Sequence, residues 1–335
     1  MRIDFIDNMK ALGILLVIIG HLPFLLIDSL VILIYSFHMP LFFFISGFLI
    51  GDKLSMFSPK KFIRYCLSGY IMPYIIFFCL SLFFFILALY MRGELNEFSL
   101  QVSSIVLGFF WVTSDTLNVN AVLWYFSAAW TTLVFAFIFE KLLSIYFCEK
   151  SLLLGLFILI IFIGTPLIHG GLPWNISIVH ISLFFVMLGK LSKKYILIVS
   201  KIDKRNYHWL AVISLFSIVS YSSLYNGRVD LASGILGYSN ALFIVNAIVM
   251  LFCVFFVASS FSATRVAQWL SLRSLIIFPL HIFAIQILTM IMKPTFENIS
   301  FLHSLLYLLL YLLFVLIFSF IAEKFLSKIF PQIFK

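Results

Sequence analysis

The stretch DNMKALGILLVIIGH, residues 7–21, decides how the rest of the chain is interpreted. Lys10 and His21 stand eleven residues apart, about three helical turns, so a helix places them on one face, with Asp7 on the same side. At ~1.5 Å per residue, His21 lies roughly 16 Å along the helix from Lys10. If Lys10 marks a membrane edge, His21 lies near the middle of the bilayer, where an ionisable residue is costly and by default functional.

The composition assigns the chain to the integral membrane proteins. Of its 335 residues, 64% are hydrophobic, only 10% are charged and 42 are Phe, which is more apolar surface than a soluble domain can bury. The apolar runs are about twenty residues or longer, so we expect helices, because barrel strands would alternate over ~10 residues. We expect no cleavable signal peptide, since the first run is full length and no small-residue cleavage site follows it.

The expected fold is an all-α integral membrane protein with about ten transmembrane helices. We place them near residues 9–28, 30–51, 62–90, 121–147, 151–168, 176–197, 207–225, 239–261, 269–291 and 301–327. The stretch 99–114 is apolar but short, which fits a re-entrant or interfacial helix. With the N-terminus in the cytoplasm, only Arg92, Arg228 and Lys293 of the 22 basic residues lie outside. This positive-inside bias places both termini in the cytoplasm.

The same bias explains the net charge of +9 as a topology signal, so we expect no nucleic-acid partner. The chain shows no repeat, low-complexity linker or soluble segment, so we expect one transmembrane domain over residues 1–335 with no appended soluble domain. The four cysteines form no close pair, and we expect neither a disulfide framework nor a metal site from them.

Three histidines in the apolar spans each stand two residues from a proline. The pairs are His21 with Pro23, His38 with Pro40, and His281 with Pro279. A proline inside a helix removes a backbone hydrogen bond and frees a carbonyl four residues back. Broken helices at membrane depth are tolerated only where they line an enclosed or watery cavity. Because the three histidines lie at comparable depths, we expect them to converge on one site within the membrane.

Simpler interpretations stay open. A lone histidine in a membrane helix can merely bond a neighbouring helix, and this alternative is strongest for His281. Trp124 suits an interfacial aromatic belt better than a substrate platform. Lys60, Lys61 and Arg64 fit orientation signals better than ligands. Three histidines also permit a metal site, but their scattered spacing argues against one.

The stretch also resembles the membrane acyltransferase-3 family, especially its O-antigen and exopolysaccharide O-acetyltransferase branch. Lys10 and His21 match the family's pattern of a basic residue, ten residues and a histidine, with lysine where many members have arginine. FHMPLFFFISG, residues 37–47, matches the second-helix motif almost in full. Looser likenesses occur at KKFIR (60–64), LWYF (123–126) and Ser274-Leu275. The resemblance is specific over residues 4–52 and weak elsewhere.

The resemblance implies a membrane O-acyltransferase that moves acetyl from cytoplasmic acetyl-CoA to a sugar hydroxyl of a lipid-linked or cell-surface polysaccharide. The implied location is the bacterial inner membrane. The implied partners are acetyl-CoA, a glycan or lipid-linked oligosaccharide acceptor and the lipid bilayer, and no cofactor is expected to be bound permanently. A periplasmic esterase-like relay domain, which some members carry, is expected to be absent or supplied by another protein.

The catalytic residues implied are His21, His38, Asp7 and Lys10. A sugar hydroxyl is a poor nucleophile, and a neutral His21 imidazole in an apolar site suits a general base at pH 7. His38 or Ser46 would stabilise the oxyanion. Asp7 would pair with Lys10 at i,i+3, unless Lys10 meets a CoA phosphate. A covalent acyl-histidine relay stays open as a variant.

Donor and substrate binding is expected from Ser46, Arg64, Lys60, Lys61, Trp124 and His281, with no metal. The CoA phosphates would rest on a basic cytoplasmic mouth, with Arg64 as the preferred contact because a guanidinium binds phosphate best. The mouth consists of Lys10, Lys53, Lys60, Lys61 and Arg64.

The alternative function is a polytopic transporter or flippase for a lipid-linked sugar or acyl donor. It explains many helices, broken segments and polar groups at the midplane equally well. The lack of visible duplicated halves and the match at residues 37–47 argue against it.

Overall fold

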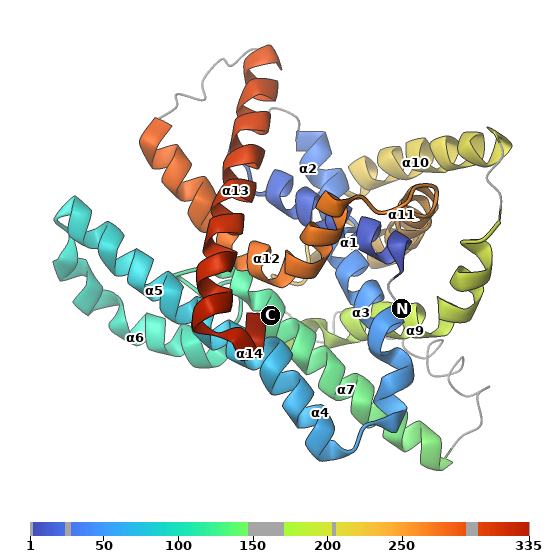
Figure 1. Ribbon diagram of the computed structural model, residues 1–335, viewed down its shortest axis with the longest axis horizontal. Coiled ribbons are helices and arrows are strands. Elements are labelled where there is room, and N and C mark those ends of the chain that lie inside the picture. The colour runs from blue at the N-terminus through green and yellow to red at the C-terminus, as the bar shows by residue number, and fades with distance from the viewer. Residues whose placement is uncertain (1–2, 24–27, 147–170, 203–205, 293–300, 335) are drawn as a thin grey trace. The chain divides into compact units, whose positions relative to one another are not determined.

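The computed structural model describes the chain apart from residues 1–2, 24–27, 147–170, 203–205, 293–300 and 335. Figure 1 shows that its regular structure is mainly helical. The helices are α1 (Asp4–Gly20), α2 (Asp28–Tyr35), α3 (His38–Met56), α4 (Pro59–Cys66), α5 (Met72–Arg92), α6 (Leu95–Trp111), α7 (Trp124–Tyr146), α9 (Val179–Val199), α10 (Asn206–Asn226), α11 (Asn240–Ser259), α12 (Arg265–Met292), α13 (Phe301–Ile329) and α14 (Pro331–Phe334).

Shorter elements connect these helices. A π-helical turn, Leu67–Ile71, joins α4 to α5, and 3₁₀ turns at Ala121–Leu123 and Pro173–Ile178 precede α7 and α9. Two short strands, β1 (Val229–Asp230) and β2 (Ile235–Leu236), pair with each other between α10 and α11.

The protein is an all-α membrane protein. In the part of the chain that the structure describes, eight segments are long and apolar enough to cross a membrane: Asp28–Met56, Pro59–Arg92, Ala121–Leu142, Pro173–Val199, Asn206–Asn226, Asn240–Ser259, Arg265–Met292 and Leu302–Ile329. These segments confirm the prediction of a helical, multi-pass membrane protein. The expected span at 151–168 lies outside the described residues.

The first expected span, 9–28, differs from the structure. α1 has 17 residues and ends at Gly20, ahead of Pro23. Proline lacks the N–H that a continuing helix needs and disfavours a helical conformation in the residue before it. His21 is therefore the C-cap residue of α1 and not a residue in the interior of a long helix.

The second expected span is broken, as the proline pattern predicts, but the break falls at Ser36 and Phe37, between α2 and α3. Pro40 lies in the first turn of α3, where a missing N–H leaves no bond unmade because the first N–H groups of a helix lack intrahelical partners. Pro279, in contrast, lies inside α12, and the helix continues through it.

The chain divides into two compact units, with the boundary inside α3 between Ile45 and Ser46. The first unit holds residues 1–45, 192–229 and 236–335, and the second holds residues 46–191 and 230–235. In the first unit α1 packs against α12 and α11. Met9 and Ile14 of α1 are fully buried, and the Asn8 side-chain amide donates to the carbonyls at the end of α11 and just beyond it.

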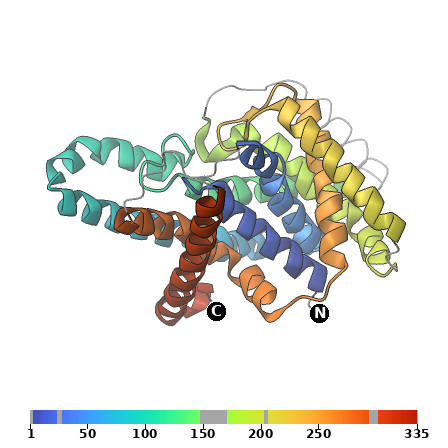
Figure 2. The same cartoon turned by 90° about the horizontal axis from the view of Figure 1, so that it is seen from above.

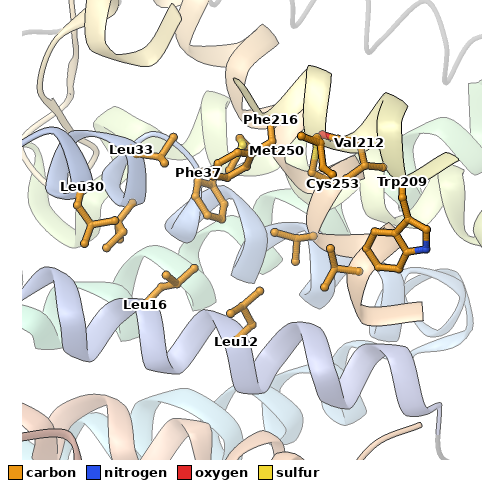
Figure 3. A pocket seen from close by; sticks show the side chains of 14 residues that line it. Leu12, Leu16, Leu30, Leu33, Phe37, Trp209, Val212, Phe216, Met250 and Cys253 are labelled. Carbon is orange, nitrogen blue, oxygen red and sulfur yellow. The ribbon is translucent and has the colours of Figure 1, made fainter. Parts of the chain in front are cut away.

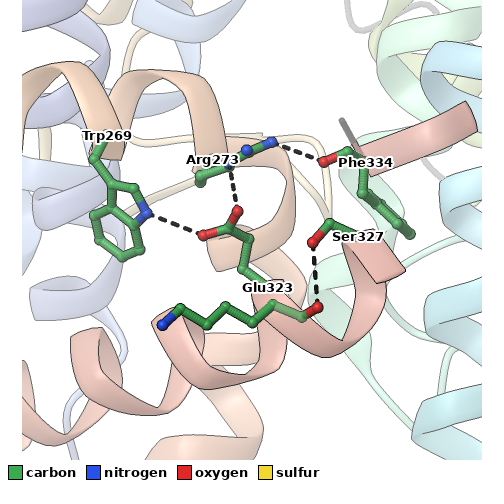
Figure 4. A network of polar contacts seen from close by, with 6 residues as sticks. Trp269, Arg273, Glu323, Ser327 and Phe334 are labelled. Carbon is green, nitrogen blue, oxygen red and sulfur yellow. Dashed lines mark hydrogen bonds and ion pairs between the residues drawn. The ribbon is translucent and has the colours of Figure 1, made fainter. Parts of the chain in front are cut away.

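A polar network in the first unit fixes the C-terminal helices to α12 (Figure 4). Glu323 of α13 accepts a hydrogen bond from the Trp269 indole (3.1 Å) and an ion pair from Arg273 Nε (3.0 Å). Arg273 also donates to the carbonyl of Phe334 in α14 (2.8 Å). Arg273 therefore contacts α13 through Nε and α14 through Nη1 and holds both helices in place.

The second unit contains α4 to α7 with parts of α3 and α9. Within it α5 and α6 lie side by side (Figures 1 and 2). α3 packs closely on α9 because Gly47 has no side chain; a Cβ there would overlap the carbonyl of Val186. Lys190 of α9 forms an ion pair with Glu140 of α7, and both side chains are mostly buried.

A buried asparagine fixes three irregular points of the second unit. Asn175 Nδ2 donates to the carbonyls of Val112 (2.8 Å) and Trp124 (3.2 Å) and to Ser127 Oγ (2.6 Å). Val112, Trp174 and Asn175 all have positive φ angles, of 54°, 57° and 56°. Such conformations cost non-glycine residues energy and persist where surrounding contacts hold them. The Asn175 amide provides such a contact to Val112, and the Trp174 indole donates to the carbonyl of Phe110 (2.8 Å).

Candidate active site

Three histidine side chains meet in the first unit, two of them at helix ends. His21 follows α1, His38 begins α3, and His281 comes from the middle of α12. The rings of His21 and His281 are 4.9 Å apart, centre to centre, in an edge-to-face arrangement. The centre of the Tyr35 ring lies 6.1 Å from that of His21 and 4.9 Å from that of His38. We call His21, Tyr35, His38 and His281 the histidine cluster.

Each histidine donates a hydrogen bond from Nδ1 to a backbone carbonyl. His21 bonds Val17 (2.8 Å), His38 bonds Ile34 (2.8 Å), and His281 bonds Phe278. A carbonyl oxygen can only accept, so Nδ1 must carry the proton in all three rings. In a neutral imidazole, the other nitrogen, Nε2, then holds a lone pair. All three rings therefore have the same tautomer, and each can accept a proton at Nε2.

The local sequence explains why two of these bonds form. The last carbonyls of a helix have no intrahelical N–H partner. Val17 lies in the last turn of α1 and Ile34 in the last turn of α2, and the histidine four residues later satisfies each carbonyl. At His21 and at His38, one hydrogen bond therefore both pairs a carbonyl at the end of the preceding helix and fixes the tautomer of the imidazole.

Tyr35 reaches the end of α1 because Gly20 has no side chain. A Cβ on Gly20 would lie 3.1 Å from the Tyr35 ring, closer than side chains normally approach. The Tyr35 hydroxyl donates a long hydrogen bond, 3.4 Å, to the Gly20 carbonyl. Tyr35 was not among the sequence candidates. No helical spacing links it to His38, because the chain breaks at Ser36 and Phe37 between the two residues.

His281 is the most enclosed member of the cluster. Its side chain is fully buried, and its Nε2 has no hydrogen-bond partner among the described residues. His38 is also buried, whereas His21 is partly exposed. Buried polar atoms almost always have a partner, so Nε2 of His281 is a position where a donor from a bound molecule or a water would be stabilised.

Asp7 and Lys10 lie on α1, as the sequence places them. The Asp7 carboxylate is buried and accepts a 2.6 Å hydrogen bond from Ser271 of α12. Asp7 therefore fixes α1 to the helix that carries His281. Asp7 and Ser271 are 264 residues apart in the sequence, so no local sequence pattern predicts this contact. Lys10 is partly exposed on the same helix.

The remaining candidates belong to the second unit. Ser46 hydrogen-bonds the side chain of Tyr125 within the LWYF stretch. Trp124 begins α7 and is only 8% exposed, so it does not present its ring on the surface of this unit. Lys60, Lys61 and Arg64 are exposed on α4, whose first turn is capped by Ser58.

Over the described ranges, no group of three or more His, Cys, Asp or Glu side chains could hold a metal ion. Imidazole rings with a lone pair on Nε2 are suited to proton transfer, and Tyr35 supplies the hydroxyl of the histidine cluster.

One comparison with known proteins bears on this site. A family model described as an acyltransferase domain matches residues 3–324, nearly the whole chain. No curated protein and no solved structure matches the chain. The match extends the resemblance from the first two helices to all the elements that carry the histidine cluster.

Proposed function

Because the chain belongs to the acyltransferase-3 family and is a multi-pass membrane protein, we propose that it transfers acetyl from acetyl-CoA to a sugar hydroxyl. The acceptor is a lipid-linked or cell-surface glycan, and the membrane is the bacterial inner membrane. The donor and acceptor rest on the family resemblance. The role of the residues rests on the geometry of the histidine cluster.

The observation that carries the proposal is the shared tautomer of the three histidines. With Nδ1–H held by a carbonyl, each neutral ring can accept a proton only at Nε2. A sugar hydroxyl is a poor nucleophile, and a positioned base accelerates its attack by typically 10²–10⁴-fold. His21 is the base in this proposal, because it is the partly exposed member and the one that faces both Tyr35 and His281.

The reaction then proceeds in two proton transfers. His21 Nε2 takes the proton of the sugar hydroxyl as its oxygen attacks the thioester carbonyl, and a C–O bond forms. The tetrahedral intermediate collapses, the C–S bond breaks, and the imidazolium returns the proton to the departing CoA thiolate. The bond from Nδ1 to Val17 orients the ring throughout and shares the positive charge of the imidazolium.

The oxyanion needs a hydrogen-bond donor, and the Nδ1 hydrogen bonds of the histidines limit which residue can supply it. A neutral His38 has its only N–H on Ile34, so its Nε2 cannot donate to an oxyanion. Tyr35 carries the O–H of the cluster, and its ring centre lies 6.1 Å from that of His21 and 4.9 Å from that of His38. Its hydrogen bond to the Gly20 carbonyl is long, 3.4 Å, so the hydroxyl would exchange that acceptor for the oxyanion. We therefore favour Tyr35 over His38 as the donor, and assign His38 to positioning Tyr35. His281 Nε2 would accept a hydrogen bond from a second hydroxyl of the sugar.

The test is transfer of labelled acetyl in membranes that contain the protein and the glycan of their host. We expect label from acetyl-CoA in the glycan and a new acetyl signal in its NMR spectrum, both absent without the gene. Malonyl-, succinyl- and butyryl-CoA in parallel reactions define the donor. If the glycan stays unlabelled with every donor while a lipid-linked sugar moves between leaflets, the protein is a flippase and the proposal is overturned.

A further inference from the structure

A cavity of about 390 Å³ lies in the first unit, among α1, α2, α10 and α11 (Figure 3). Leu12 and Leu16 of α1 form one wall, Trp209 of α10 lies at one end, and Met250 of α11 forms part of the opposite wall. Its volume falls in the range of roughly 300–1,000 Å³ that ligand sites occupy.

The lining excludes polar ligands. Every side chain on the wall is apolar or aromatic, apart from the thiol of Cys253, which is directed to the carbonyl of Val212. A sugar or a CoA phosphate would lose its hydrogen bonds to water here without replacement, at a large cost in free energy. The chemistry of the site therefore selects hydrocarbon.

The lining of the cavity includes both exposed residues of α10 and fully buried residues of the interior of the unit. Ile213 and Phe216 of α10 are 59% and 43% exposed, whereas Ile34 and Met250 are 1% and 2% exposed. The exposed residues belong to Asn206–Asn226, a segment apolar and long enough to cross a membrane. A mouth on such a helix opens into the hydrocarbon of the bilayer, where acyl chains are the surrounding solvent.

We propose that this cavity binds one acyl chain of a bilayer phospholipid. An empty cavity of this size would leave its walls without contacts that close packing normally supplies. A phospholipid is favoured over the acceptor of the proposed reaction by the faces of α1. Leu16 follows Asp7 by nine residues, two and a half turns, so the cavity and the α12 contact lie on opposite faces of α1.

The bound chain would support α2 from behind. Ile34 and Phe37 line the cavity, and Tyr35 and His38 of the histidine cluster are their sequence neighbours. The proposal concerns lipid binding and does not depend on acyl transfer, so the two can fail separately.

The experiment uses the full chain in nanodiscs of phosphatidylcholine doped with a phosphatidylcholine whose acyl chain ends in a diazirine. After illumination, labelled residues are mapped by mass spectrometry. We expect adducts at Ile34 or Met250, because their burial leaves the cavity as their route to lipid. Ile218, 64% exposed on α10, is the internal reference for labelling by bulk lipid.

Two variants give the matched comparison. Val254→Phe adds a ring to the cavity wall, and Val245→Phe adds the same ring to α11 at a site that is 55% exposed. Labelling of Ile34 and Met250 should fall severalfold in Val254→Phe and stay unchanged in Val245→Phe, with Ile218 constant in both. Native mass spectrometry of the wild-type protein should show one phospholipid that detergent washing removes last.

Results on the wild-type protein alone can overturn the proposal, so it does not depend on the folding of Val254→Phe. Adducts confined to exposed residues such as Ile213 and Ile218 would mean that only bulk lipid contacts the protein. Retention of a polyprenyl-linked sugar in place of phospholipid would make the cavity an acceptor site. Protection of the cavity in a dimer would make it a contact between copies of the chain. Each of these results contradicts the proposal.

Discussion

The histidine cluster of the first unit can be compared with the Asn175 cluster of the second, which consists of Asn175, Val112, Trp124 and Ser127. Both place polar side chains in apolar surroundings, yet they leave different atoms available. Asn175 uses its amide nitrogen on Val112, Trp124 and Ser127, so its donors hold irregular backbone in place. Each histidine uses Nδ1 on a backbone carbonyl, and Nε2 of His281 has no partner among the described residues. The polar group that retains an acceptor is the one suited to chemistry.

The ion pair between Lys190 and Glu140 resembles the Asn175 cluster, because its polar groups are also used on each other within the second unit. Its two charges lie on α9 and α7, mostly buried and directed at each other. The sequence suggests only that Lys190 is one of many basic residues that orient the chain in the membrane. The structure adds a specific partner, so loss of Lys190 acts on the stability of the second unit.

The largest expected effect is on His21. His21→Ala should lower acyl transfer by roughly 10²–10⁴-fold, the usual contribution of a general base, with normal amounts of inserted protein. Labelled acetyl transfer in membranes, normalised to protein, measures it. His303→Ala, an exposed histidine on α13, is the matched control and should keep full activity. Retained activity in His21→Ala would remove the catalytic assignment.

Breaking the buried ion pair comes next. Lys190→Met leaves the Glu140 carboxylate uncompensated and should destabilise the protein by about 3–5 kcal/mol, because a lone buried charge is strongly unfavourable. Thermal unfolding in detergent measures the loss. The double variant Glu140→Gln/Lys190→Met removes both charges and should recover much of it. If the double variant is as unstable as the sum of the singles, the two side chains do not act as a pair.

A smaller loss is expected at Asn175. Asn175→Ala removes the amide donor to the carbonyls of Val112 and Trp124, and the single Ser127 O–H can serve only one of them, so the change should cost about 1–3 kcal/mol, again read from thermal unfolding. Asn175→Gly loses the same hydrogen bonds but suits the positive φ better, so it should be the more stable of the two. Asn118→Ala, at an exposed asparagine, is the control. Equal stability of Asn175→Ala and wild type would show that the hydrogen bonds do not hold this backbone.

The smallest expected effect concerns the basic residues of α4. Arg64→Ala and the Lys60→Ala/Lys61→Ala double variant should each raise KM for acetyl-CoA by up to about fivefold, since exposed charges contribute little individually. kcat should change less, because donor binding and not the transition state is affected. Saturation kinetics at low and moderate salt measure both. Lys194→Ala on α9 is the matched exposed lysine. An unchanged KM in both α4 variants would leave these residues as topology signals.

The Nδ1 bonds of His21 and His38 could be predicted from the sequence in principle, because each joins residues four apart at a helix end near a proline. The position of the break was harder. Pro23 ended α1 at Gly20, eight residues before the expected end of the first span. Proline fixes only the backbone around it, and whether a helix bends or stops depends on what satisfies the last carbonyls.

The sequence by itself determined the class of the protein. A chain that is 64% hydrophobic, with its apolar residues in runs of helix length, has more apolar surface than a soluble fold can bury. The sequence also placed His21 and His38 at broken helices. Only the tertiary structure brought His281 to His21 and Ser271 to Asp7, across more than 250 residues of chain. Periodicity and helix caps are local properties, whereas the faces that meet depend on how every side chain packs. That packing also placed Tyr35 beside two histidines and left the hydrocarbon-lined cavity behind α2.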